Sequence, residues 1–314
     1  MLHRLPFRAM GGEMLAILET EMDSQPSILN LVPIWFEKWE QTLSRFRSGS
    51  ELSLLNQTFD QPVKVSDTLW DVFQYSLSAE TLTNGLVTPT VLDAMLDAGY
   101  DQNFDTLPRY QSQYGLQVLS AVNPLSVVIW DEKSQTICLP YGIHLDFGGV
   151  AKGWAAHQTV ERLKEYGPAL MNAAGDIAVS GPRANDEVWQ IGVSDPFVPE
   201  SDFEILKLKR GGVATSGRDR RRWSQNGQPR HHIINPYTGQ SAETDVMTAT
   251  VVAPTVMEAE AAAKAVLILG SEEGLKWIES DPVLAGIIVL ENGHTLYSQR
   301  MADYVMSPTV PQVS

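Results

Sequence analysis

The 314-residue chain contains a single cysteine, Cys138, so it can form neither an intrachain disulfide nor a cysteine metal cluster. Cys138 lies in a β-rich apolar run, and we interpret it as a core residue. No segment approaches about 18 uninterrupted apolar residues, the length that a transmembrane helix needs. We therefore expect no insertion into a membrane.

The N-terminal residues 1–8 lack the apolar run of about seven or more residues that a signal peptide needs. They also lack a lipobox cysteine, because the one cysteine lies far downstream. We expect a cytoplasmic protein on these grounds.

Positive charge is scarce: 23 Lys and Arg stand against 38 Asp and Glu, which gives a net charge of −15 and a pI near 4.8. This balance disfavours nucleic acid or an anionic membrane surface as a partner. An anionic ligand would need local positive groups, and the conspicuous source is Arg218 with Arg220, Arg221 and Arg222. These arginines either steer such a ligand or form a solvated loop.

A serine nucleophile is disfavoured, because the sequence has no Gly-x-Ser-x-Gly elbow. Ser216, in Thr215-Ser-Gly, offers a hydroxyl at the end of an expected strand without that elbow.

The stretch His144-Leu-Asp-Phe-Gly-Gly-Val-Ala-Lys-Gly-Trp-Ala-Ala carries the most chemical information. Before Gly148, two β-rich runs, 136–139 and 141–147, are split by Pro140 and predict a hairpin. After it, small and apolar residues at three- and four-residue spacing predict an amphipathic helix that stops at Gly167-Pro168.

Gly148-Gly149 is therefore expected at a helix N-terminus, where free N–H groups and the helix dipole suit a phosphate. Asp146 would offer a fixed acceptor to a ligand, and Lys152 a cation one turn into the helix. The alternative is a tight connection in which glycine only satisfies a positive φ and binds nothing.

The remaining pattern favours an α+β fold over a doubly wound sheet, because strands and helices alternate irregularly. We expect a first strand from Phe7 with a bend after Met10, and little regular structure between Tyr100 and Ser126, which suggests a surface insertion. Disorder is expected from Pro308. Further helices are expected at 28–46, 65–80, from Pro89-Thr90 and after the Thr255/Glu258 capping box. Strands are expected at 188–193, 203–209 and 247–253, and a hairpin of 284–290 with 294–298 around Asn292-Gly293.

Two further groups suit catalysis. His232 follows a β-rich run and is the side-chain type poised near neutral pH, so it suits a general acid or base, although a lone histidine on a strand is also commonly structural. Glu260 and Lys264 are spaced for an ordinary i, i+4 ion pair on one helix.

The order of several short blocks resembles the ApbE family of FAD-dependent flavin transferases. The blocks are Met10-Gly11, the run 44–56, Gly85-Leu-Val-Thr-Pro-Thr-Val, Asp146-Phe-Gly-Gly-Val-Ala-Lys-Gly, Asn172-Ala-Ala-Gly-Asp-Ile, Val213-Ala-Thr-Ser-Gly, His232-Ile-Ile-Asn-Pro-Tyr-Thr-Gly and Thr248-Ala-Thr-Val-Val-Ala-Pro-Thr. The resemblance covers roughly residues 7 to 300.

The resemblance implies an α+β fold, related to the T-fold, that holds FAD in a cleft between a helical part, roughly 26–100, and a β-rich core, roughly 127–300. One domain, 1–300, would be followed by a tail, 301–314. Members typically cleave FAD, transfer FMN to a threonine hydroxyl of an acceptor protein and release AMP, using magnesium. By position, the FAD site would include Met10, Phe46, Leu86, Val87, Thr88, Asp146, Lys152 and Ile234, and His232 would be the proton acceptor.

The resemblance also implies a magnesium site at the Gly149 carbonyl and at the helix after Ala-Pro-Thr, where this sequence departs from the family. The usual aspartate and, four residues on, threonine are here Glu260 and Lys264. An ammonium cannot ligate a metal. Either the longer Glu260 side chain still reaches magnesium, or Lys264 supplies the positive charge itself. Thr88 and Asn235 likewise stand where the family has aspartates. These changes predict weakened or absent metal dependence.

Three functions agree with this sequence. The first is a protein flavinyltransferase acting on a threonine in a redox partner. The second is a protein that binds FAD without transferring it, and the third is a hydrolase that releases AMP and FMN.

Overall fold

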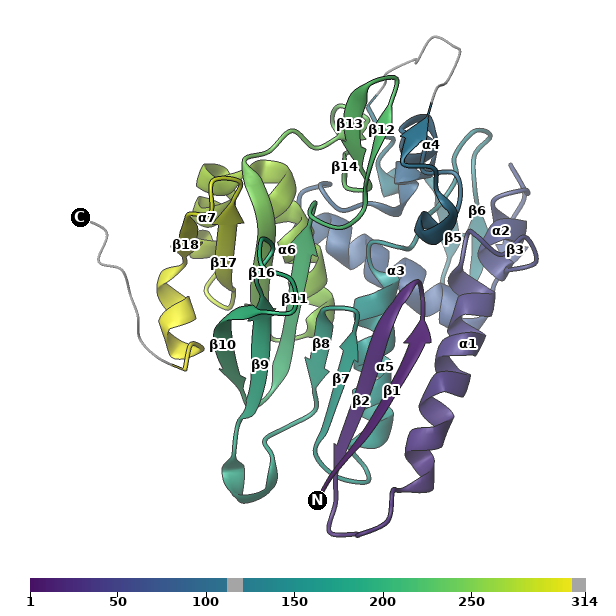
Figure 1. Cartoon of the computed structure of the whole chain (residues 1–314). Coiled ribbons are helices and arrows are strands. Elements are labelled where there is room, and N and C mark those ends of the chain that lie inside the picture. The colour runs from purple at the N-terminus through teal and green to yellow at the C-terminus, as the bar shows by residue number, and fades with distance from the viewer. Residues whose placement is uncertain (112–120, 307–314) are drawn as a thin grey trace.

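The computed structural model describes residues 1–111 and 121–306 and is built around an antiparallel sheet (Figure 1). The strand order is β1 (Leu2–Ala9), β2 (Gly12–Glu19), β7 (Ala169–Ala173), β8 (Asp176–Val179), β11 (Gly211–Gly217), β16 (Val246–Ala253), β17 (Ala285–Leu290) and β18 (Thr295–Tyr297). Segments from both ends of the chain thus share one sheet. The expected α+β class is confirmed.

The N-terminal segment is a hairpin rather than one bent strand. β1 and β2 pair along their whole length, and Met10 and Gly11 form the turn with φ of 48° and 69°. Two successive positive φ angles are the requirement of the type I′ turn that joins tightly twisted strands. Asn84-Gly85, at 49° and 84°, turns the chain in the same way after α3 (Asp67–Leu82).

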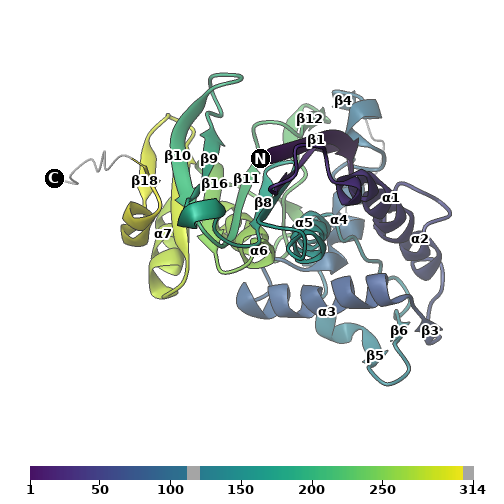
Figure 2. The same ribbon diagram turned by 90° about the horizontal axis from the view of Figure 1, so that it is seen from below.

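Helices α5 (Ala151–Leu163), α6 (Val256–Leu269) and α7 (Ser271–Ser280) lie against one face of the sheet, and α3 lies outside α5 and α6 (Figure 2). The predicted capping box begins α6: the Thr255 hydroxyl accepts from Glu258 N, and the Glu258 carboxylate accepts from Thr255 N. Five of the ten buried residues of α6 are alanines, so this helix approaches the sheet closely.

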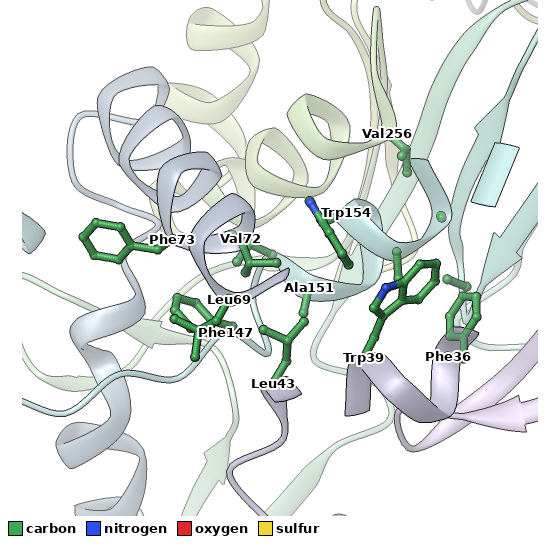
Figure 3. Packing of buried hydrophobic residues seen from close by; sticks show 14 of the residues in the cluster. Phe36, Trp39, Leu43, Leu69, Val72, Phe73, Phe147, Ala151, Trp154 and Val256 are labelled. Carbon is green, nitrogen blue, oxygen red and sulfur yellow. The ribbon is translucent and has the colours of Figure 1, made fainter. Parts of the chain in front are cut away.

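The helical part joins this layer through a large apolar core (Figure 3). Trp154 of α5 meets Trp39 of α1 (Val32–Leu43) edge to face, with ring centroids 5.3 Å apart. α2 (Glu51–Leu55) and α3 begin at Ser50 and Ser66, whose hydroxyls accept backbone N–H bonds as N-caps. α4 (Leu92–Asp97) follows a 3₁₀ turn at Pro89–Val91.

The opposite face of the sheet is covered by β9 (Trp189–Ser194) and β10 (Asp202–Leu208), which form an antiparallel pair over a second core.

The fold continues past residue 300, where a tail was expected. Met301 is fully buried within a 3₁₀ helix, Gln299–Asp303, and Val305 forms a β-bridge with Leu206. The expected disorder from Pro308 falls outside the described residues, and the division of 1–300 into one domain of two lobes stays a prediction.

The hairpin expected at 136–147 is wrong. β6 (Thr136–Cys138) pairs instead with β5 (Ile129–Asp131) and β3 (Val63–Lys64). The following residues join no ladder, because other groups satisfy their backbone: the Asn56 amide bonds both Leu145 N and Leu145 O at 2.8 Å, and Asp146 N donates to Pro89 O at 2.7 Å. The segment is thereby fixed to the helical part.

Short strands complete the fold beside α4. β12 (Arg222–Gln225) pairs with β13 (Gln228–His231) and β4 (Tyr110–Gln111), and β14 (Ile234–Asn235) pairs with β15 (Gln240–Ser241). The described residues of the weakly patterned region include the 3₁₀ turns Phe104–Thr106 and Leu125–Val127. Residues 112–120 of that expected insertion lie outside the described residues.

Candidate functional site

A cavity of about 910 Å³ opens between the helical part and the ends of the sheet strands. Its lining includes all eight residues that the sequence predicted for a flavin site: Met10, Phe46, Leu86, Val87, Thr88, Asp146, Lys152 and Ile234. His232, Gly149 and Lys264 also line it, whereas Glu260 is fully buried behind it. The fold therefore brings together residues that lie more than 200 positions apart.

One wall of the cavity holds the buried pair Arg45 and Asp146. Arg45 Nε lies 2.6 Å from Asp146 Oδ2, a close ion pair without hydrogen-bond alignment. The guanidinium also donates to Tyr100 O at 2.7 Å and lies over the rings of Phe46 and Tyr100, at 4.1 and 4.7 Å from their centroids. This cation is thus held on several sides and forms part of the wall.

The Gly148-Gly149 turn precedes α5, as predicted, but neither glycine has a positive φ. Space is the reason for glycine at 148, because a Cβ there would lie 2.8 Å from Asp146 Oδ1, the atom that accepts from Gly148 N at 2.7 Å. A Cβ on Gly149 would make an ordinary contact with Lys264 Cε at 3.6 Å. The positive-φ explanation of this turn is therefore wrong. The N-cap residue Val150 offers no capping side chain, and Gly153 N in the first turn of α5 donates instead to Glu260 Oε2.

The opposite wall holds four interlocked charges, Lys152, Asp176, Glu260 and Lys264, which we call the charge cluster. Lys152 Nζ donates to Asp176 and to Glu260 Oε1, the latter at 3.1 Å. Lys264 Nζ donates to the same Glu260 oxygen at 3.0 Å, which confirms the expected i, i+4 pair. Gly153 N donates to Glu260 Oε2 at 2.9 Å.

The charge cluster is layered relative to the cavity. The carboxylates of Asp176 and Glu260 are 3% and 1% exposed, whereas the side chains of Lys152 and Lys264 are 18% and 16% exposed. The cavity therefore meets ammonium groups that carboxylates hold from behind. Gly153 permits this arrangement, because a Cβ there would lie 2.7 Å from Glu260 Oε2.

Burial and neighbouring charge compete in this cluster. Burial raises the pKa of Asp176 to about 6 even though Lys152 opposes the shift. Burial opposes the charged form of Glu260, but the two lysines outweigh it and lower the pKa of that carboxyl. Burial likewise opposes the charged form of Lys152, yet Asp176 and Glu260 raise its pKa. Burial lowers the pKa of Lys264, against the attraction of Glu260.

These residues do not fit the magnesium ion that the resemblance implies. Mg²⁺ requires several oxygen ligands in near-octahedral geometry. Both Glu260 oxygens already accept hydrogen bonds, and the stem of Lys264 lies beside Gly149. Within residues 1–111 and 121–306, no three His, Cys, Asp or Glu side chains are grouped as a metal site would need.

His232 lies between β13 and β14, with a buried Nδ1 that has no hydrogen-bond partner among the described residues. Its neighbour His231 is structural, since its Nε2 bonds Ala242 O at 3.0 Å. Burial, followed by the positive charge of Arg221, lowers the pKa of His232 well below its usual value. The ring is neutral at pH 7 and can accept a proton.

The arginine cluster is divided by the fold. Arg220 and Arg221 line the cavity, but Arg220 is 78% exposed and pairs with Asp219. Arg218 bonds Val246 O and Glu291 away from it, and Arg222 is exposed on β12. Arg221 makes no hydrogen bond or ion pair within the described part of the chain, so it is the member suited to an anion.

The two further positions that depart from the family have local structural roles. Thr88 Oγ1 lies 2.8 Å from Thr90 Oγ1 and caps the 3₁₀ turn at Pro89–Val91. Asn235 Oδ1 accepts from Tyr237 N at 3.0 Å across Pro236, as an aspartate would.

Sequence reasoning missed Arg45, Asp176 and the specific place of Arg221 on the cavity wall. Each lies inside a segment that the sequence analysis had singled out. The sequence did not show which residue each of them contacts. Only the fold shows that Arg45 faces Asp146, and Asp176 faces Lys152.

Comparison with known proteins agrees with this architecture. The sequence model of the ApbE family matches residues 18–288. The chain belongs to the ApbE family. Relatives include an FAD:protein FMN transferase of Vibrio cholerae, 26% identical over 83% of this chain and 79% of its own length, and one of Treponema pallidum, 26% identical over 86% and 78%.

Solved ApbE structures share the fold. The ApbE protein of Thermotoga maritima superposes with a TM-score of 0.85 at 23% identity, covering 96% of this chain and 98% of its own. The apo flavinyl transferase ApbE of Pseudomonas stutzeri gives 0.80 at 20% identity, covering 96% of each chain. Among the described residues, no helix has the length and apolar character needed to cross a membrane.

Proposed function

We propose that this ApbE-family chain is an FAD:protein FMN transferase, which moves FMN from FAD to a threonine hydroxyl of an acceptor protein and releases AMP. The observation that carries the proposal is the placement of His232, neutral and unpaired at Nδ1, on the same cavity as Lys152, Lys264 and Arg221. The names of the relatives support the same activity.

The cavity suits FAD in size and chemistry. Its volume of about 910 Å³ lies in the range of ligand pockets, which is roughly 300–1,000 Å³. We assign FAD contacts to the eight predicted lining residues, from Met10 to Ile234. The cations would bind the diphosphate, which a protein of net charge −15 attracts only locally.

The reaction joins the acceptor oxygen to the FMN phosphorus. As that P–O bond forms, the bond from the same phosphorus to the bridging oxygen breaks, and AMP leaves with the bond electrons. A threonine hydroxyl is a weak nucleophile, so the His232 imidazole takes its proton. Nearby cations and backbone N–H groups stabilise the charge on the phosphoryl oxygens.

Two alternatives use the same cavity: retention of FAD without transfer, and attack by water, which would release FMN and AMP. The absence of a metal-ligand set among the described residues favours the first alternative if a metal is essential. We further propose that the protein lies in the cytoplasm. We also propose that its helical part and β-rich core form one domain, whose fold continues past residue 300 to Val305.

The test is incubation of purified protein with FAD, with and without a threonine-bearing acceptor peptide, following AMP and peptide-bound flavin. We expect AMP and flavinylated peptide in equal amounts, and loss of both in His232→Ala. His294→Ala is the control, because His294 is exposed on the β17–β18 turn. AMP with free FMN would indicate the hydrolase, and bound FAD without AMP would indicate the binding protein.

A further inference from the structure

The cavity presents an ammonium where a phosphate-transfer site commonly uses a divalent cation. Lys264 is anchored by Glu260 Oε1 at 3.0 Å, and its stem lies beside Gly149 at the turn before α5. The group is therefore fixed beside the Gly149 backbone rather than free on a flexible stem. A held cation needs little rearrangement when charge develops on a ligand.

The charge cluster also removes the usual reason for binding a metal. Two lysines balance two carboxylates, so no uncompensated negative charge remains to attract Mg²⁺. A metal at Glu260 would have to displace an ammonium and break its hydrogen bonds. Like charges at such short range repel, and an ammonium has no lone pair to offer.

We propose that the Lys264 ammonium takes the place of a divalent metal against the ligand's diphosphate, so that this chain binds FAD and releases AMP without a divalent cation. This inference rests on the proposed function for its ligand. The metal-free binding that it predicts can be measured separately from transfer.

Arg221 completes the arrangement from the other side. It lines the cavity without a hydrogen bond or ion pair among the described residues, and it acts electrostatically on both His232 and Lys152. A diphosphate between Lys264 and Arg221 would meet positive charge on two sides. Arginine suits this position because its planar group can donate two parallel hydrogen bonds to phosphate.

The experiment measures FAD affinity by flavin fluorescence in excess EDTA and in excess Mg²⁺, for the wild type and for Lys264→Met. Methionine keeps much of the length of the side chain without its charge. We expect the wild-type dissociation constant to be the same within about twofold in both buffers, and Lys264→Met to bind FAD at least about tenfold more weakly in EDTA. Lys276→Met is the control, because Lys276 is an exposed lysine on α7 with its own i, i+4 glutamate pair.

A second variant, Lys264→Thr, replaces the ammonium with an oxygen ligand and leaves Glu260 available. We expect this variant to gain a requirement for Mg²⁺, with FAD affinity restored at least about fivefold by the ion. Circular dichroism establishes that each variant is folded. Wild-type affinity that rises tenfold with Mg²⁺, or a folded Lys264→Met that binds like the wild type, would overturn the proposal.

AMP release in the same samples separates the two proposals. AMP formed by the wild type in EDTA supports both the transferase activity and its independence of a divalent metal. AMP formed only with Mg²⁺ overturns the proposed metal independence but still supports the transferase activity. Metal-independent FAD binding with no AMP, even with acceptor present, contradicts the transferase and the metal-free AMP release but supports the role of Lys264 in binding.

Discussion

The two charged walls of the cavity are built differently. On one side, Arg45 and Asp146 form a pair in which both side chains are 6–7% exposed. The pair is enclosed by two aromatic rings and a backbone carbonyl, and its charges are satisfied within the wall. On the other side, the charge cluster draws on α5, β8 and α6, and its lysines are partly exposed to the cavity.

This difference suggests that the Arg45–Asp146 pair has a structural role and that the charge cluster interacts with the ligand. A buried pair of opposite charges contributes shape, and its charge is largely cancelled at the cavity surface. A cluster with its carboxylates beneath its ammonium groups presents positive charge to whatever enters. The comparison predicts that the cluster is the more costly of the two to break, because Glu260 holds three groups, Lys152, Lys264 and Gly153 N, whereas Asp146 holds two.

The largest effect is expected for Glu260→Ala. Removal of this carboxylate leaves the Lys264 ammonium without an ion-pair partner, takes one partner from Lys152, and frees Gly153 N. Breaking a buried ion pair by losing one partner costs about 3–5 kcal/mol. Denaturant unfolding without ligand measures the loss, and Glu161→Ala, which breaks a half-exposed i, i+3 pair, should cost less than about 1 kcal/mol. Equal losses in the two variants would contradict the cluster's role.

Asp146→Ala should cost less, about 2–3 kcal/mol of unfolding free energy. The variant loses the ion pair and the acceptor for Gly148 N. Arg45 keeps its hydrogen bond to Tyr100 O and its two aromatic neighbours, which still stabilise a cation. The same unfolding assay tests the order of the two variants. A loss greater than that of Glu260→Ala would reverse the comparison.

The elements with a strong local signal were predictable from the sequence. The Thr255/Glu258 capping box marks the start of α6, and Asn292-Gly293 marks the β17–β18 hairpin, because both depend on nearby residues. The segment 141–147 failed for the opposite reason. Its alternation resembles a strand, but Asn56, almost 90 positions earlier, bonds its backbone instead.

The candidate site divides along the same line. The lining residues came from a family resemblance and all face one cavity. The ion-pair partners of these residues could not be predicted in this way, since nothing near Lys152 in the sequence points to Asp176 or Glu260. An i, i+4 spacing predicts that Glu260 and Lys264 pair, yet it says nothing of the second lysine that shares the carboxylate.

Gly153→Ala tests whether the close approach of α5 and α6 holds the cluster together. The added Cβ would lie 2.7 Å from Glu260 Oε2 and 3.3 Å from Val256 O. Overpacking of this kind costs about 1–3 kcal/mol, and the better helix propensity of alanine returns about 1 kcal/mol. The difference is about 0–2 kcal/mol, and the 2.7 Å contact with Glu260 is short enough to force a shift, so we expect a net loss in its upper half, about 1–2 kcal/mol in unfolding. Gly181→Ala, which meets no atom within 4 Å, is the control. A neutral Gly153→Ala would show that the helices can separate freely.

The smallest effect concerns pH. Burial lowers the pKa of His232, and the positive charges of Arg221, His231, Lys264 and Lys152 lower it further. A base works when it is unprotonated, so wild-type AMP release should stay level as the pH falls from about 8 to about 6.5, the ordinary pKa of histidine.

Arg221→Gln removes the largest of those neighbouring charges, so protonation of His232 becomes easier and its pKa rises. The acid limb of the pH–rate profile for AMP release should therefore move toward neutral pH, by less than about one unit because burial remains the main cause. Arg220→Gln, on the same loop but 78% exposed and paired with Asp219, should leave the limb in place. A limb that moves to lower pH in Arg221→Gln, or moves equally in both variants, would mean that the titrating base is not His232 beside Arg221.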